Sequence, residues 1–178
     1  PLHVSAAEWY KKKLHTPQDI IEFLHHTISH ADSEVAAEEI ALRGKELVNS
    51  GQLELLGLIN RLIDSKGPAK TWGKLWHLRG ELLALAGDFG GAEASFTVAM
   101  DHANKAKDIE LESTLLSCLA DLAWKRGDST LALDLHRQAL KRFIAIKNSI
   151  GASRTYTNMS YIFRLQGAKE RRPCDRRG

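Results

Sequence analysis

Apolar side chains recur three and four positions apart along most of the chain, which is the spacing of one face of an α-helix. Gly-Asp pairs interrupt this pattern, because glycine suits the left-handed residue after a helix and aspartate caps the next helix. No window alternates apolar and polar residues with a period of two, so we expect no β-strands. The predicted helices open at Ser5 and Thr16 and then cover residues 32–50, 53–63, 69–86, 89–106, 109–126, 129–147 and 151–166.

The middle of the chain predicts a helical hairpin. Trp76 and Gly80 are one helical turn apart and share a face, and the absence of a side chain at Gly80 lets a second helix approach its backbone. Ala92, Phe96 and Ala99 follow at spacings of four and three residues, on one face of the next helix. We expect Trp76 to fill a buried site between the two helices.

This pattern recurs along the sequence. The pair Gly87-Asp88 returns as Gly127-Asp128, and a further glycine, Gly167, stands at the same interval again. Small residues stand at matching offsets in the second copy, such as Ala120 and Ala132. Self-similarity at a period of this length indicates a helical solenoid.

The segment from about residue 70 to 167 resembles the tetratricopeptide repeat. The matching positions of its first copy are Trp76, Gly80, Leu83, Gly87, Asp88, Ala92, Phe96 and Ala99. The chain departs from that pattern at Arg79, where Leu is usual, at His136, which replaces the aromatic residue, and at the absent closing prolines. The resemblance implies an all-α fold, a right-handed superhelical array of antiparallel helix pairs that binds other proteins.

The segment 1–66 is similar to the helical stretch that follows the winged helix in signal-transduction ATPases with numerous domains, such as activators of the maltose-regulon type. The similarity consists of His3, Ala6 to Tyr10, Glu22 to His26, Ala36-Ala37, Gly44 to Leu47 and Gly51. It implies that the chain is the helical linker and the first sensor repeats of a regulatory ATPase. Gly67 to Leu75 falls short of a phosphate loop, because five residues separate the glycines and Leu75 cannot bind a metal ion.

The composition limits the class of protein and the cellular compartment to which the chain can belong. The 178 residues are 43% apolar, which suffices for a packed core. No apolar run is long enough to span a membrane. Cys118 and Cys174 form no disulfide framework, and no secretion signal opens the chain, so we expect a cytoplasmic protein. The net charge of +3 resides in residues 169–178, so the body of the chain is not a nucleic-acid surface.

Candidate chemistry is sparse. Glu22, His26 and His30 share a helical face, but a metal site needs further ligands, and polar residues on an outer face explain them as well. No spacing argues for nucleophilic catalysis. We therefore predict no catalytic residues, no metal site and no cofactor.

The repeat resemblance places a binding groove on the first helix of each hairpin. The groove residues that it implies are Lys74, His77, Glu81, Asp121, Trp124, Arg154, Tyr161 and Arg164. Aromatic residues and arginines of this kind suit a protein, a peptide or a small effector.

The sequence divides into degenerate helical pairs over residues 1–66, repeats over 67–167 and a basic, disordered tail over 168–178. The third repeat lacks a second helix, so Tyr156, Met159 and Phe163 should be exposed and should be covered by another copy or by further repeats. The leading interpretation is a non-catalytic binding module of a regulatory ATPase. The alternatives are a free-standing repeat adaptor and, more remotely, a metal-dependent hydrolase built on Glu22, His26 and His30.

Overall fold

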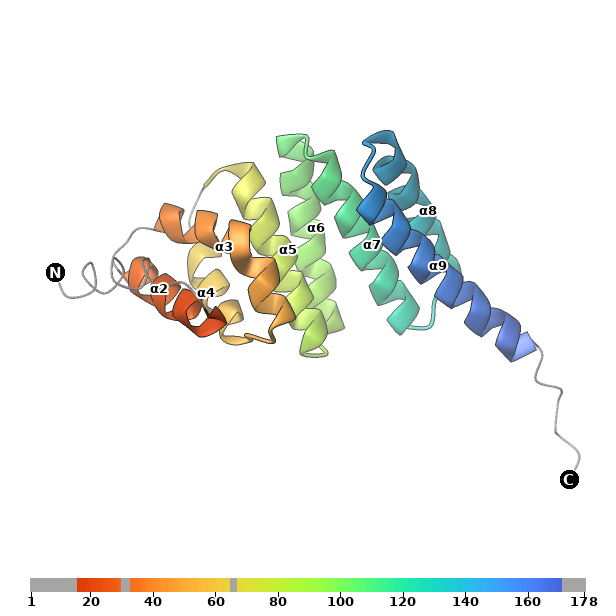
Figure 1. Ribbon diagram of the computed structural model, residues 1–178, viewed down its shortest axis with the longest axis horizontal. Helices are drawn as coiled ribbons and strands as arrows, with labels where there is room; N and C mark the ends of the chain where they lie inside the picture. The colour runs from red at the N-terminus through yellow and green to blue at the C-terminus, as the bar shows by residue number, and fades with distance from the viewer. Residues whose placement is uncertain (1–15, 30–32, 65–66, 171–178) are drawn as a thin grey trace, which may run out of the picture. The chain divides into compact units, whose positions relative to one another are not determined.

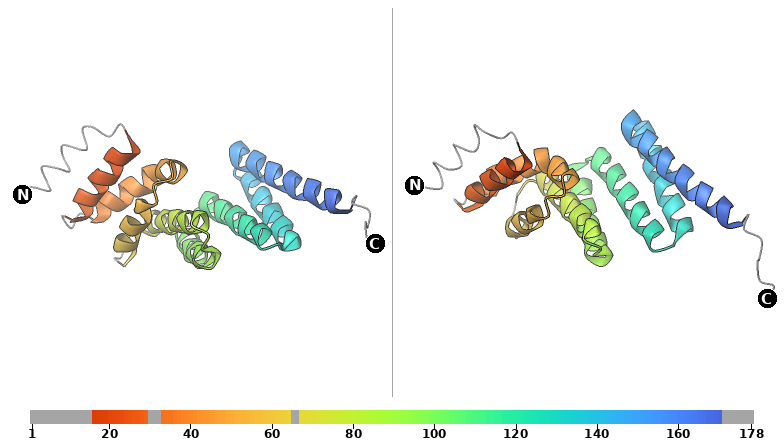
Figure 2. Two further views of the ribbon diagram at one scale, coloured as in Figure 1. Left: turned by 90° about the horizontal axis from the view of Figure 1, so that it is seen from below. Right: turned by 60° about the horizontal axis from the view of Figure 1, so that its bottom comes forward.

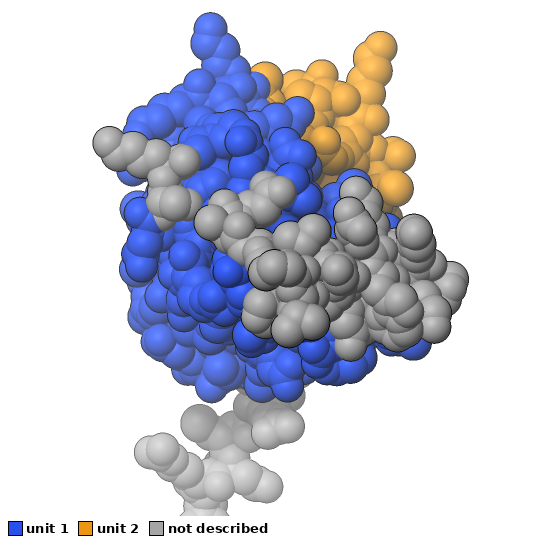
Figure 3. All heavy atoms as spheres, turned by 90° about the vertical axis from the view of Figure 1, so that its left-hand side faces the viewer, with its two compact units in different colours: residues 1–108 blue, residues 109–178 orange. Residues whose placement is uncertain are grey.

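The computed structural model describes residues 16–29, 33–64 and 67–170, with the side chains of 168–170 left aside. Every regular element within these ranges is an α-helix, which confirms the predicted all-α class (Figure 1). The helix predicted at Ser5 and the tail beyond residue 170 lie outside the described residues. The chain forms two compact units, residues 1–108 and 109–178, which we describe one at a time (Figure 3).

Unit 1 contains five described helices. They are α2 (Pro17–Ser29), α3 (Ser33–Asn49), α4 (Glu54–Ile63), α5 (Ala69–Leu85) and α6 (Phe89–Ala106). One apolar core joins α2 to α5 and includes Leu24, Ile40, Leu55 and Leu75, all fully buried. Because α5 shares this core, the division predicted at residue 66 does not coincide with the boundary between the compact units.

Helices α5 and α6 pack side by side as a hairpin (Figures 1 and 2). A Cβ atom at Gly80 would overlap the ring of Phe96, so the absent side chain is what lets α6 approach. Gly87 has φ +86° and Asp88 accepts a 2.8 Å hydrogen bond from the Gly91 amide, as expected of a helix end followed by a cap.

The expectation for Trp76 needs correction, because its side chain is only half-buried. The buried tryptophan of α5 is Trp72, which is 4% exposed and belongs to the core shared with α2, α3 and α4. Trp76 instead lies beneath the guanidinium group of Arg79, whose Cζ is 5.3 Å from the centre of the ring. The hairpin pattern alone could not show that Trp72 packs against the helices that precede α5.

Arg79 also explains why the chain departs from the repeat pattern at this position. Its Nε atom donates to Oδ1 of Asn60 on α4 at 2.8 Å, and its Nη1 donates to Oγ of Ser95 on α6 at 2.5 Å. A leucine could make neither bond. Arg79 therefore ties α4, α5 and α6 together with a half-buried, hydrogen-bonded guanidinium group.

Unit 2 contains α7 (Ile109–Lys125), α8 (Ser129–Ala145) and α9 (Ser149–Glu170). Helices α7 and α8 form a second hairpin, and α9 packs mainly on α8 (Figure 2). Fully buried His136 occupies the place that Phe96 takes in α6, among helices that share the buried residues Ala132 and Ile162.

Helix α9 corrects two expectations. It continues through Gly167 to Glu170, past the predicted end at residue 166, because no capping residue follows Gly167 and the next residues favour helix. Met159 is not freely exposed, since it packs against the core of unit 2. Tyr156 and Phe163 are exposed as expected, at 54% and 49%.

The Gly80 contact gives a matched pair of substitutions. Gly80→Ala should lower the free energy of unfolding by about 1–2 kcal/mol, because the buried Phe96 ring would have to move. Gly57→Ala, also within a helix but with nothing within 4 Å of the new Cβ, should raise it by about 0.5–1 kcal/mol. Urea unfolding measures both, and equal effects would contradict the packing of α5 on α6.

The two tryptophans of α5 give a second pair. Trp72→Ala should cost about 3–5 kcal/mol because it empties a buried site. Trp76→Ala should cost distinctly less, since that ring is partly in solvent. Thermal melts rank the two variants, and a larger loss for Trp76→Ala would contradict the assignment of Trp72 to the core.

Candidate functional site

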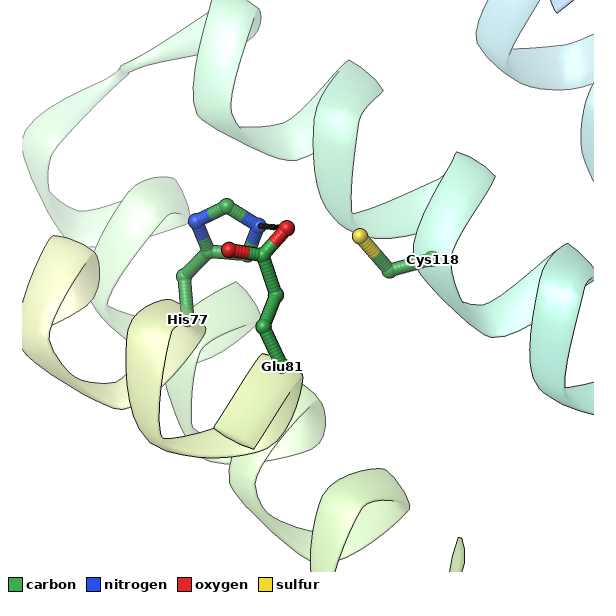
Figure 4. A group of neighbouring side chains, drawn as sticks. All are labelled: His77, Glu81 and Cys118. Carbon is green, nitrogen blue, oxygen red and sulfur yellow. Dashed lines mark ion pairs between the residues drawn. The ribbon is translucent and has the colours of Figure 1, made fainter. Parts of the chain in front are cut away.

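Three of the predicted groove residues lie on α5 in unit 1, all half-buried: Lys74, His77 and Glu81. Figure 4 shows the ion pair of the last two, with His77 Nε2 3.7 Å from Glu81 Oε1. The ammonium group of Lys45, on α3, pairs with the same oxygen. Glu81 therefore serves contacts within unit 1, and its charge is already compensated.

The other five lie in unit 2, on α7 and α9, and the structure brings several of them together. The rings of Trp124 and Tyr161 meet edge to face, with their centres 6.1 Å apart and their planes at 79°. Arg164 lies over the other end of this pair, with its Cζ atom 5.5 Å from the centre of the Tyr161 ring. Trp124 is half-buried against the core of unit 2, whereas Tyr161 is 47% exposed, so the row presents the tyrosine and the arginine to solvent.

Asp121, beside this row, contacts residues of the neighbouring helices. Its Oδ1 atom accepts a 3.1 Å hydrogen bond from Nδ2 of Asn158 on α9. The same oxygen lies 3.3 Å from Nε2 of buried His136 on α8, although that approach does not meet hydrogen-bond geometry. Asp121 thus joins α7 to α9 through one hydrogen bond and also lies close to α8.

Arg154 and Arg164 are exposed, and neither forms an ion pair with any residue in the described part of the chain. Residues 149–167 of α9 contain no aspartate or glutamate. The described surface of α9 is therefore positive, and its guanidinium groups are available to an anionic ligand.

A hollow of about 730 Å³ runs along α9. The described residues that line it are Ser149, Ala152, Ser153, Tyr156, Thr157, Ser160, Tyr161 and Arg164. The sequence reasoning did not anticipate this hollow, although small residues at 149, 152, 153 and 160 were a visible signal that this side of α9 carries little bulk.

The structure describes two of the three residues of the alternative metal site. Glu22 and His26 are both half-buried on α2, whereas His30 lies outside the described residues.

No described helix is long and apolar enough to cross a membrane. Comparison of the chain with protein-family models and with curated proteins finds no match to either.

Asp121 offers a test of the geometry of unit 2. Asp121→Ala should destabilise the protein by about 1–2 kcal/mol, because the Asn158 amide loses its partner and α9 loses a tie to α7. Asp134→Ala, which removes an exposed pair with Arg137 within α8, should change stability by less than about 0.5 kcal/mol. Chemical denaturation compares the two, and equal losses would show that Asp121 does not join the helices.

Proposed function

We propose that this chain is a non-catalytic binding module whose helix pairs form a right-handed superhelical array of the tetratricopeptide type. The two hairpins, α5 with α6 and α7 with α8, support this proposal through their common design. In both, a glycine with positive φ ends the first helix and an aspartate caps the second. Stacked hairpins of this kind present first helices on one face, where partners bind.

The observation that carries the proposal is the row of Trp124, Tyr161 and Arg164 on α7 and α9, in which Trp124 is half-buried against the core of unit 2 and the other two side chains are exposed. Aromatic residues and arginine contribute most of the energy at protein interfaces, because they offer large area with little conformational entropy to lose. A hydrogen bond between Asn158 of α9 and Asp121 of α7 fixes the two helices that carry the row, so the row is ordered before a partner binds.

The charges near the row indicate the kind of partner. Arg154 and Arg164 offer planar donors for carboxylates, and neither has a carboxylate partner among the described residues. We therefore propose that the partner is a protein or peptide segment with an acidic group next to an apolar side chain. The larger setting that fits is the linker and sensor repeats of a cytoplasmic signal-transduction ATPase.

A display selection tests this function directly. Random peptides selected on the immobilised chain should be enriched in acidic and aromatic residues. Titration of a selected peptide should lose about 1–3 kcal/mol of binding free energy in Trp124→Ala and in Arg154→Ala. The melt of Arg154→Ala should be unchanged, whereas Trp124→Ala should also lower the melting temperature, because Trp124 packs on the core of unit 2.

The matched control is Arg137→Ala, which removes an exposed arginine from α8, away from the row. It should leave the affinity unchanged. The proposal is contradicted if the affinity of the selected peptides is unchanged by substitution of Trp124 and Arg154 but is lost on substitution of Arg137 or Glu93. Binding would then involve the second helices.

A further inference from the structure

We propose that the outer face of α9 is a second docking surface, which binds an acidic amphipathic helix of a partner protein. The outer face consists of Ala152, Tyr156, Ser160 and Phe163. The partner helix lies along α9 as α6 lies along α5. This surface adjoins the row formed by Trp124, Tyr161 and Arg164, because Tyr161 and Arg164 also line the hollow, whereas Trp124 does not.

Burial distinguishes the two sides of α9. Gly151, Thr155 and Ile162 are buried and mark the side that packs against α7 and α8. Tyr156 and Phe163 stand on the other side, each about half exposed, and Tyr156 lines the hollow along the helix. Two large aromatic side chains on one exposed helix face indicate an interaction surface rather than a solvated one.

The repeat period shows what kind of element this face accommodates. Tyr156, Ser160 and Phe163 correspond to Trp76, Gly80 and Leu83 of α5. In α5 this face receives α6, and the ring of Phe96 lies against Gly80.

The matching residues of α7 behave in the same way. Ala120 is fully buried and Ala123 packs with Ala132 and Leu133 of α8. A helix with a small, an aromatic and another small residue at spacings of four and three therefore fits the outer face of α9. The hollow spans Ser149 to Arg164, a helix length of about 22 Å, enough for such a helix of four turns.

Charge indicates that the arriving helix is acidic. Within unit 2, carboxylates of α7 contact the neighbouring segments: Glu112 pairs with Arg142 of α8 at 2.6 Å, and Glu110 accepts from Asn148 in the turn between α8 and α9 at 2.9 Å. The described part of α9 has the opposite charge, because residues 149–167 include arginines and no carboxylate, and Arg164 borders the hollow. A partner with glutamate or aspartate beside its apolar stripe would pair with these guanidinium groups.

A second copy of this chain is the poorer occupant. The described helix with the required pattern is α6, and its Ala92 and Phe96 are 0% and 2% exposed against α5. A second copy could offer that face only by opening its own hairpin. A separate partner helix carries no such cost.

The probe is a peptide copied from residues 88–106 of this chain. It contains Ala92, Phe96 and Ala99, and Asp88, Glu93 and Asp101 against Lys105 give its side chains a net charge of −2. Lysine and glutamate introduced at positions 90 and 94, both exposed in α6, are condensed to a lactam with loss of water, which holds the peptide helical, and circular dichroism verifies this. Fluorescence anisotropy measures binding of the labelled peptide to the full chain.

We expect saturable binding that weakens at least tenfold in Ser160→Trp, because the new ring fills the outer face. Ile150→Trp is the matched control, since Ile150 is 83% exposed on the same helix but does not line the hollow. It should bind as the unsubstituted chain does. A peptide with lysine at positions 93 and 101 should bind more weakly, and the difference should shrink in high salt.

Trp124→Ala should leave this affinity unchanged within about twofold, so failure of the groove and failure of this surface are distinguishable. The proposal is overturned if the helical peptide does not bind, or if Ser160→Trp binds it as well as the unsubstituted chain. Sedimentation gives the third contrary result: self-association that Ser160→Trp abolishes would make a second copy the occupant.

Discussion

Each hairpin of this chain depends on the close approach of two helices at a position without bulk. At Gly80 no side chain separates the backbone of α5 from the Phe96 ring, so the ring fills the space between the helices. Close packing of this kind recovers dispersion energy that a gap would forfeit. A helix that is apolar on more than one side must meet a neighbour on each, which is why α5 contacts α3 and α4 as well as α6.

Unit 2 obeys the same constraint with different residues. His136 replaces the aromatic ring of the first hairpin and is fully buried, and Asp121 approaches it from α7 while receiving the amide of Asn158 from α9. The polar contact fixes the position of α9, and α9 in turn carries the exposed tyrosine and arginines. The features proposed for binding therefore depend on a partly buried contact that makes no direct contribution to a ligand.

The sequence predicted the helices well because their ends carry strong local signals. Gly51, Gly87 and Gly127 adopt the left-handed conformation, and the capping aspartates behave as their positions indicate. Lys107 and Lys147 adopt the same conformation without glycine, so those helix ends had a weaker signal. The end of α9 was missed because Gly167 resembles the other glycines but lacks a capping residue after it.

The pattern of apolar residues along the chain gave less information about tertiary contacts. Helical periodicity cannot tell which of two tryptophans on α5 faces a neighbouring pair, and Trp72 proved to be the buried one. For the candidate site, the repeat resemblance selected Trp124, Tyr161 and Arg164, which do adjoin one another. It could not show that Asp121 and Glu81 are committed to contacts within their own units, because those partners come from other helices.

Amide chemical-shift mapping tests the central claim, that a partner binds through α7 and α9, most directly. The measurement is a titration of the isotope-labelled full chain with a peptide selected for binding to it. The account predicts that the perturbed amides cluster at the C-terminal half of α7 and along α9, around Trp124, Tyr161 and Arg164. Perturbations confined to α6 and α8, or to α2, α3 and α4, would contradict it.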